Sequence, residues 1–138
     1  MKIGITCHPS AGGSGILATE LGIALAERGH VVHFVTEEPP FRLQRFHENI
    51  VCHYVDAVSY PLFRTPPSLL ALATKIAETA DEFGIDLWHV HYAIPNAAAA
   101  LLARDMLPEE KRFCLVTTLH GTDITLVGTD PSFWRITK

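Results

Sequence analysis

Short apolar segments alternate with longer amphipathic ones along the whole chain, and this alternation restricts the possible folds more than any other feature. The apolar segments cover residues 2–7, 31–36, 50–55, 86–91 and 113–119, and the main helical patterns cover residues 16–28, 69–83 and 96–106. Strands that alternate with helices pair in parallel and are joined by right-handed crossovers. The sequence therefore predicts an α/β fold, a Rossmann-like doubly wound parallel sheet.

Glycine, serine and proline mark the expected ends of the helices. Gly29 and Gly84 follow the first two helical patterns, where a left-handed residue commonly closes a helix. Ser68 is the predicted N-cap of the second helix, and Pro95 occupies a suitable first-turn position for the third. Residues 60–67 contain three prolines and are predicted to form a connection.

The composition is that of a folded domain and excludes several classes of protein. Of 138 residues, 48% are hydrophobic and 19% charged, which is incompatible with disorder. A net charge of −4 lacks the basic face of a nucleic-acid-binding domain. No apolar run approaches the roughly eighteen residues of a membrane span, and no signal-peptide pattern opens the chain. The three cysteines, odd in number and without a CxxC pair, predict reduced thiols in a cytoplasmic protein.

Three polar segments follow predicted strands and are expected to meet at one edge of the sheet. They cover residues 12–15, 89–96 and 117–123. In an open parallel sheet, ligands bind beyond the carboxyl ends of the strands, near the point where the strand order reverses. Because three separate segments converge there, this edge is the predicted functional site.

The first of these segments, Gly12-Gly13-Ser14-Gly15, stands directly before a helix. Glycines let the backbone approach an anion closely, and the free N–H groups of a helix N-terminus favour negative charge. The segment therefore predicts a site for a diphosphate or a carboxylate. The alternative is a tight turn in which Ser14 caps the helix.

A dinucleotide-binding interpretation is also open. Gly13 to Ala18 reads G-x-G-x-x-A, and Glu37 lies near the end of the second strand, about where an acidic residue would bind a ribose. The glycines start several residues beyond the first strand, whereas the dinucleotide fingerprint turns immediately. A NAD-dependent oxidoreductase and a stand-alone small-anion binding module remain as alternatives.

The second and third segments supply histidines. His89 and His91 are two residues apart on a strand and share a face, so that with His120 and Asp123 they would suffice for a zinc site. Hydrogen-bonded imidazoles at the end of a sheet explain them without a metal, and no metal is predicted. His120 can act as a general base or donate a hydrogen bond to a ligand hydroxyl.

Several of these motifs resemble the retaining glycosyltransferases of the GT-B fold, over nearly the whole chain. The segments that carry the resemblance are residues 12–15, 18–21, 25–30, 40–43, 89–95 and 117–125. The strings around His89 and His120 are the most specific, and they narrow the match to the members that glycosylate L-malate.

This resemblance implies the N-terminal half of a two-domain enzyme. The reaction would transfer N-acetylglucosamine from UDP-GlcNAc to L-malate with retention, the first step of bacillithiol biosynthesis, without metal or cofactor. Residues 1–138 would form the acceptor-binding domain, and a C-terminal nucleotide-sugar domain would be missing. An apolar Phe133-Trp134 pair in a helix that begins near the end of the chain agrees with this expectation. Relatives can dimerise, so a homodimer is possible.

On the donor side, the resemblance assigns three residues. Gly13 and Ser14 would lie against the donor diphosphate, where their N–H groups stabilise the charge of the leaving UDP. His120 would be the catalytic residue beside the transferred sugar, acting through a hydrogen bond to a hydroxyl or through its backbone carbonyl.

On the acceptor side, the resemblance implies a pocket for L-malate lined by Tyr92, Asn96 and Thr118. Thr122 and Asp123 would support this site. The family often has histidine at the position of Asn96, and an aromatic residue is expected at that of His8. Both departures leave the exact acceptor open.

Overall fold

The computed structural model describes residues 1–8, 12–59, 61–62, 64–65 and 67–137. Its strands form one parallel sheet in the order β3-β2-β1-β4-β5. The strands are β1 (Lys2–Thr6), β2 (Val31–Thr36), β3 (Ile50–Tyr54), β4 (Leu87–His91) and β5 (Cys114–Thr118). The strand order reverses between β1 and β4, the arrangement of Rossmann-like folds. The predicted fold class is confirmed.

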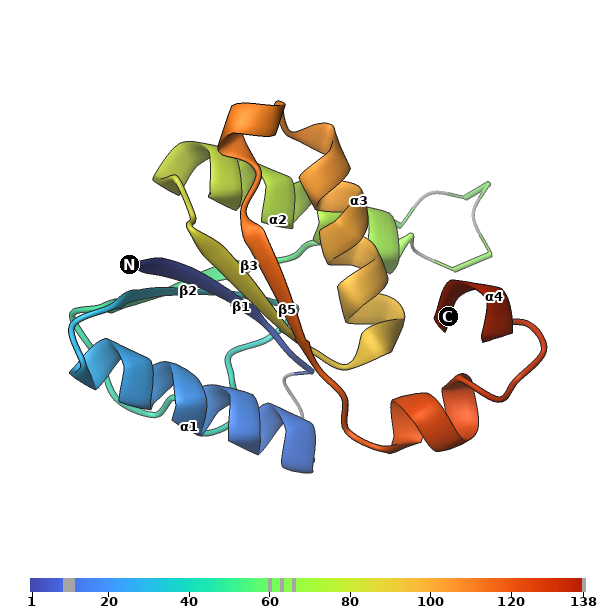
Figure 1. The fold of residues 1–138 in the computed structure, drawn as a ribbon, viewed down its shortest axis with the longest axis horizontal. Helices are drawn as coiled ribbons and strands as arrows, with labels where there is room; N and C mark the ends of the chain where they lie inside the picture. Colours follow the sequence, from blue (N-terminus) through green and yellow to red (C-terminus); the bar gives the residue numbers. More distant parts are fainter. Residues whose placement is uncertain (9–11, 60, 63, 66, 138) are drawn as a thin grey trace.

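Helices cover both faces of this sheet (Figure 1). Helix α1 (Gly13–Glu27) packs on one face, and α2 (Ser68–Phe83) and α3 (Ala98–Met106) pack on the other. The shorter elements are η1 (Ala93–Ala97), η2 (Glu109–Lys111), η3 (Asp123–Val127) and α4 (Trp134–Thr137). Among the described residues, no helix combines the length and apolarity needed to cross a membrane.

Each face of the sheet has its own apolar core. On the α1 side the core contains Ile3, Ile5, Val32 and Phe34, with Ala18 and Ala26 from the helix. The larger core, under α2 and α3, contains Trp88 together with alanines of both helices. Strands β1 and β2 are buried at nearly every position, which explains their continuous apolar runs.

Trp88 is accommodated by a glycine on the neighbouring strand. Gly4 lies beside Trp88 in the register of β1 and β4. A Cβ atom at Gly4 would lie 2.4 Å from Cε3 of the indole ring, so only glycine leaves room for the ring. The indole N–H donates a hydrogen bond of 3.0 Å to Thr6 Oγ1, which satisfies the one polar atom of this side chain.

Two helices start elsewhere than the sequence predicts. Helix α1 begins at Gly13 rather than Ile16, because the amide of Ile16 already donates to the carbonyl of Gly12 at 3.2 Å. Ser68 is the first residue of α2, and its predicted cap position is taken by Pro67, which offers no side-chain hydrogen bond.

The third helix, in contrast, is shorter than predicted. Helix α3 begins at Ala98, after the π-type turn η1, in which the Ile94–Pro95 peptide bond is cis. Residues 2–7, 50–55, 86–91 and 113–119 yield strands one or two residues shorter than predicted. Tyr60, Phe63, Pro66 and Lys138, which belong to the predicted connection and the last helix, lie outside the described residues.

Candidate active site

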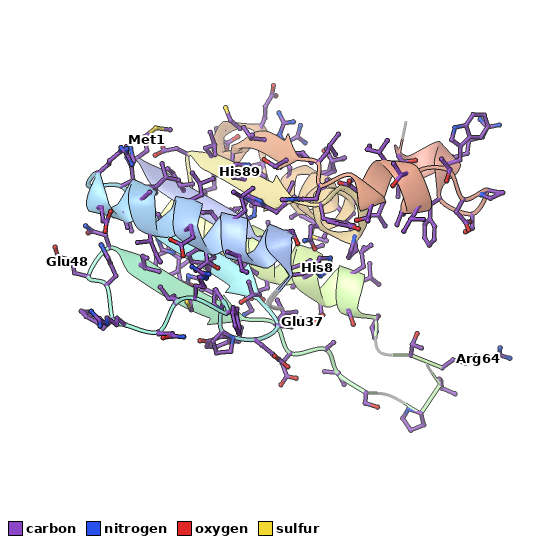
Figure 2. All side chains as sticks on the ribbon, turned by 90° about the horizontal axis from the view of Figure 1, so that it is seen from below. Met1, His8, Glu37, Glu48, Arg64 and His89 are labelled. Atoms are coloured by element: carbon purple, nitrogen blue, oxygen red, sulfur yellow. The ribbon has the colours of Figure 1, made fainter. Side chains whose placement is uncertain are left out.

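Aromatic rings from three neighbouring strands meet at the carboxyl edge of the sheet. His8 follows β1, Tyr92 follows β4 and His120 follows β5. The ring of Tyr92 meets that of His8 edge to face at 5.4 Å between centroids and stacks with that of His120 at 6.2 Å. The segments after β4 and β5 therefore converge as predicted. Figure 2 shows His8 at the same end of the molecule as the first turn of α1.

A row of imidazoles runs from β4 to the end of β5. The rings of His89 and His91 stack at 4.6 Å between centroids, and those of His91 and His120 at 5.2 Å. His91 Nδ1 lies 3.1 Å from His120 Nε2, and His89 Nε2 lies 2.7 Å from the hydroxyl oxygen of Thr118. These histidines therefore bond to one another and to Thr118.

Burial keeps His89 and His91 uncharged near neutral pH. His91 is 1% exposed, and loss of solvation, reinforced by His89 and His120, lowers its pKa to about 4. Burial, with a smaller contribution from His120, also lowers the pKa of His89. Within the described part of the chain, no group of three or more His, Cys, Asp or Glu side chains is arranged to hold a metal ion.

Asp123 joins the two segments that carry the site. Its side chain is fully buried, and its two oxygens accept hydrogen bonds of 3.0 Å from the amides of Ala93 and His120. A second link joins the hydroxyl groups of Tyr92 and Thr122. The two predicted supporting residues thus connect the turn after β4 to the turn after β5.

Tyr92 has an unusual backbone conformation. Its φ of 86° is the only positive value of a residue other than glycine in the described ranges. Such conformations are costly for residues with a Cβ atom and cluster at functional sites. The sequence does not indicate this conformation, because position 92 is occupied by neither glycine nor asparagine.

The start of α1 is open. Its N-cap is Gly12, without a side-chain cap, and Ser14 lies inside the first turn. The alternative in which Ser14 caps the helix is therefore wrong. A Cβ atom at Gly13 would meet nothing within 4 Å, so the backbone is accessible on that side. Within the described ranges, no side chain accepts a hydrogen bond from the first amides of α1, as an anion site requires.

Asn96 is buried beside the end of β4. Its side chain is 3% exposed, and its amide donates a hydrogen bond of 2.8 Å to the carbonyl of His91. It also lines a cavity of about 100 Å³ with Thr6, His8 and Glu37. The sequence placed Glu37 only in the dinucleotide alternative and His8 only as a departure from the family pattern, although both directly follow predicted strands.

Comparison with known families gives this edge of the sheet a chemical context. Residues 11–138 match Glycosyltransferase Family 4. The chain belongs to this family. The matched range includes both the start of α1 and the imidazole row.

Two individual proteins are similar to this chain, one in sequence and one in structure. It is 56% identical, over 96% of its length, to N-acetyl-alpha-D-glucosaminyl L-malate synthase from Bacillus anthracis. It spans 34% of that protein. A crystal structure of a glycosyltransferase from Rickettsia africae superimposes with a TM-score of 0.62 at 20% identity, over 84% of this chain and 28% of the other. The second comparison supports the fold of this family 4 member.

Proposed function

We propose that this chain forms the acceptor-binding domain of a retaining glycosyltransferase that transfers N-acetylglucosamine from UDP-GlcNAc to L-malate. The observation that carries the proposal is the 56% identity to the malate-glycosylating synthase over 96% of the chain. In this proposal, the residues that bind the nucleotide lie in a C-terminal domain, beyond the 34% of the relative that this chain spans. The same proposal predicts that the reaction is the first step of bacillithiol biosynthesis. It also predicts a cytoplasmic location and the ability to form a homodimer.

The first turn of α1 serves the leaving group in this proposal. When the glycosidic bond of the donor breaks, negative charge accumulates on the diphosphate of UDP. Preorganised N–H groups stabilise such charge without a reorganisation cost at the moment of reaction. The amides of Gly13 and Ser14 are proposed for this role, since Gly13 is exposed and the helix start is uncapped.

Hydroxyl groups at the ends of β4 and β5 serve the acceptor. L-Malate carries two carboxylates and one hydroxyl, so its pocket needs hydrogen-bond donors. Tyr92, which stacks on His120, and Thr118, which bonds to His89, each carry a hydroxyl group. Asn96 supports the pocket through the carbonyl of His91, to which it donates. Holding the malate hydroxyl near the anomeric carbon supplies the positioning part of catalysis.

Calorimetry with L-malate tests the acceptor assignment. We expect weak binding to this chain, and weaker binding still of succinate, which lacks the hydroxyl group. Turnover with UDP-GlcNAc is expected only when the chain is part of a protein of the relative's full length. If L-malate binds neither form, the assignment is wrong.

The two alternatives give different results in the same measurements. A stand-alone anion-binding module would bind malate and succinate equally and tightly without any further domain. An oxidoreductase would bind NADH, which a fluorescence titration detects. Either result would replace the glycosyltransferase proposal.

A further inference from the structure

The hydrogen bond between His91 and His120 restricts where their protons lie. A neutral imidazole carries one N–H donor and one nitrogen lone pair. The contact of 3.1 Å joins two ring nitrogens, so one ring must donate and the other must offer its lone pair. While this bond exists, His91 and His120 cannot both be imidazolium ions.

The other nitrogen of His91 decides the direction of this bond. His91 Nε2 is buried and has no hydrogen-bond partner in the part of the chain that the structure describes. A proton on this nitrogen would be a buried donor without an acceptor, and orphaned N–H groups are the rarer kind of unsatisfied polar atom in protein interiors. A doubly protonated His91 would carry the same orphan donor together with a buried charge, which its lowered pKa also disfavours.

We infer that His91 is a positioning residue that donates from Nδ1 to His120 Nε2 and thereby holds the proton of His120 on Nδ1. His120 then has no free lone pair. It can donate a hydrogen bond to a substrate oxygen, but it cannot accept a proton as a general base. Of the two roles that the sequence left open for His120, the structure assigns the donor.

This inference deepens the proposed function and rests on it only for the identity of the substrate. In the described part of the chain, His120 Nδ1 makes no hydrogen bond, and the ring is only partly buried. Nδ1 is therefore the nitrogen that a ligand meets. A sugar hydroxyl or a phosphate oxygen would satisfy it equally, because both accept hydrogen bonds.

Imidazole NMR of the ¹⁵N-labelled chain at pH 7.5 tests the inference without any ligand. The ¹⁵N chemical shifts of the ring nitrogens distinguish the two neutral tautomers. We expect the proton on Nδ1 in both His91 and His120, and a scalar coupling across the hydrogen bond from His91 Nδ1 to His120 Nε2. A proton on Nε2 of His120 would overturn the assignment. This measurement does not involve malate. A failure of the tautomer assignment can therefore be told apart from a failure of the proposed function.

Two substitutions at His91 distinguish a role in positioning the proton of His120 from a role in packing. His91→Phe keeps a ring but removes the donor, and we expect the proton of His120 to move toward Nε2. His91→Asn places an amide N–H near the former Nδ1, and we expect it to restore the wild-type tautomer of His120. If His120 keeps its proton on Nδ1 in folded His91→Phe, His91 does not hold it there and the inference fails. Where His91→Phe does not fold, the coupling in the wild-type chain decides.

A second histidine pair provides the matched control. His33 Nδ1 lies 2.9 Å from His53 Nε2, His33 is 2% exposed, and this pair lies against Phe83 at the C-terminal end of α2. His33→Phe removes an equivalent buried bond elsewhere in the fold. We expect it to leave the ring resonances of His120 unchanged, and a change as large as that in His91→Phe would contradict a specific role for His91.

Discussion

Two glycines of helix α1, Gly13 and Gly22, serve different purposes in this fold. A Cβ atom at Gly22 would lie 2.4 Å from Cζ of Phe34, so this glycine allows α1 to approach the sheet closely. A Cβ atom at Gly13, in the same helix, would meet nothing within 4 Å. One glycine is thus required by packing, and the other leaves space that a ligand can occupy.

Alanine substitutions at these two positions should therefore differ in their effect on stability. We expect Gly22→Ala to lower the free energy of unfolding by about 1–3 kcal/mol, because the new methyl group overpacks the core. Gly13→Ala is expected to cause no loss. Urea unfolding followed by circular dichroism measures both variants, and equal effects would contradict this account of α1.

The proposed donor-side residues should affect turnover without affecting folding. In a protein of the relative's full length, we expect His120→Ala to lower kcat about a hundredfold, the scale of one lost transition-state contact. Gly13→Val is expected to abolish turnover, because its side chain fills the space in front of the helix start. His30→Ala, at the opposite end of α1, is the control, and steady-state kinetics is the measurement. Normal rates in both site variants would contradict the proposed positions.

At the scale of elements, the ends of β4 and β5 form one unit because Asp123 binds both. The amide of Tyr92 also donates to the carbonyl of Thr118 at 3.0 Å, so the sheet pairing continues into the turn. The positive φ of Tyr92 is maintained between these two restraints. Strain of this kind persists only where the surrounding structure determines the conformation.

Removal of the Asp123 carboxylate should release both turns together. We expect Asp123→Ala to lower the free energy of unfolding by about 1–3 kcal/mol, since two amides lose their acceptor. Hydrogen exchange at the amides of Ala93 and His120 should accelerate in parallel. Asp130→Ala is the control, because Asp130 is exposed and its carboxylate accepts hydrogen bonds only from Ser132 among the described residues. Acceleration at only one of the two amides would disprove the joint role.

At the scale of the whole molecule, buried histidines on both faces of the sheet link stability to pH. Burial, with contributions from His53 and Lys2, lowers the pKa of His33 to about 4, and His91 has a similar value on the other face. A histidine with a lowered pKa in the folded state takes up its proton more readily after unfolding. Acid therefore favours the unfolded chain.

We expect the free energy of unfolding to be nearly constant between about pH 7 and 8 and to fall as the pH drops from about 6.5 toward 4. The sign follows because the unfolded histidine, with a pKa near 6.5, binds a proton in this window while the folded one does not. His33→Phe should reduce the slope between pH 6 and 5 by about one proton. Urea unfolding at a series of pH values measures this slope, and an unchanged slope would mean that His33 is not buried in neutral form.

Local sequence determined the elements and the general position of the site. The alternation of apolar segments predicts the parallel sheet, and Gly29 and Gly84 mark helix ends, because periodicity and turn chemistry act over a few residues. In the structure both glycines have positive φ values, 84° and 63°. The residues after β4 and β5 were expected at one edge because carboxyl ends of parallel strands meet there.

Tertiary structure alone decided how these residues bond. His91 and His120 stand 29 positions apart in the chain, and their hydrogen bond depends on the register that places His91 beside Thr118. The burial of Asp123 depends on the amides of another turn. Neither the left-handed backbone of Tyr92 nor the unprotonated Nε2 inferred for His91 follows from any local pattern. Both depend on long-range contacts, which determine burial and hydrogen-bond partners, and these in turn determine where a proton is held.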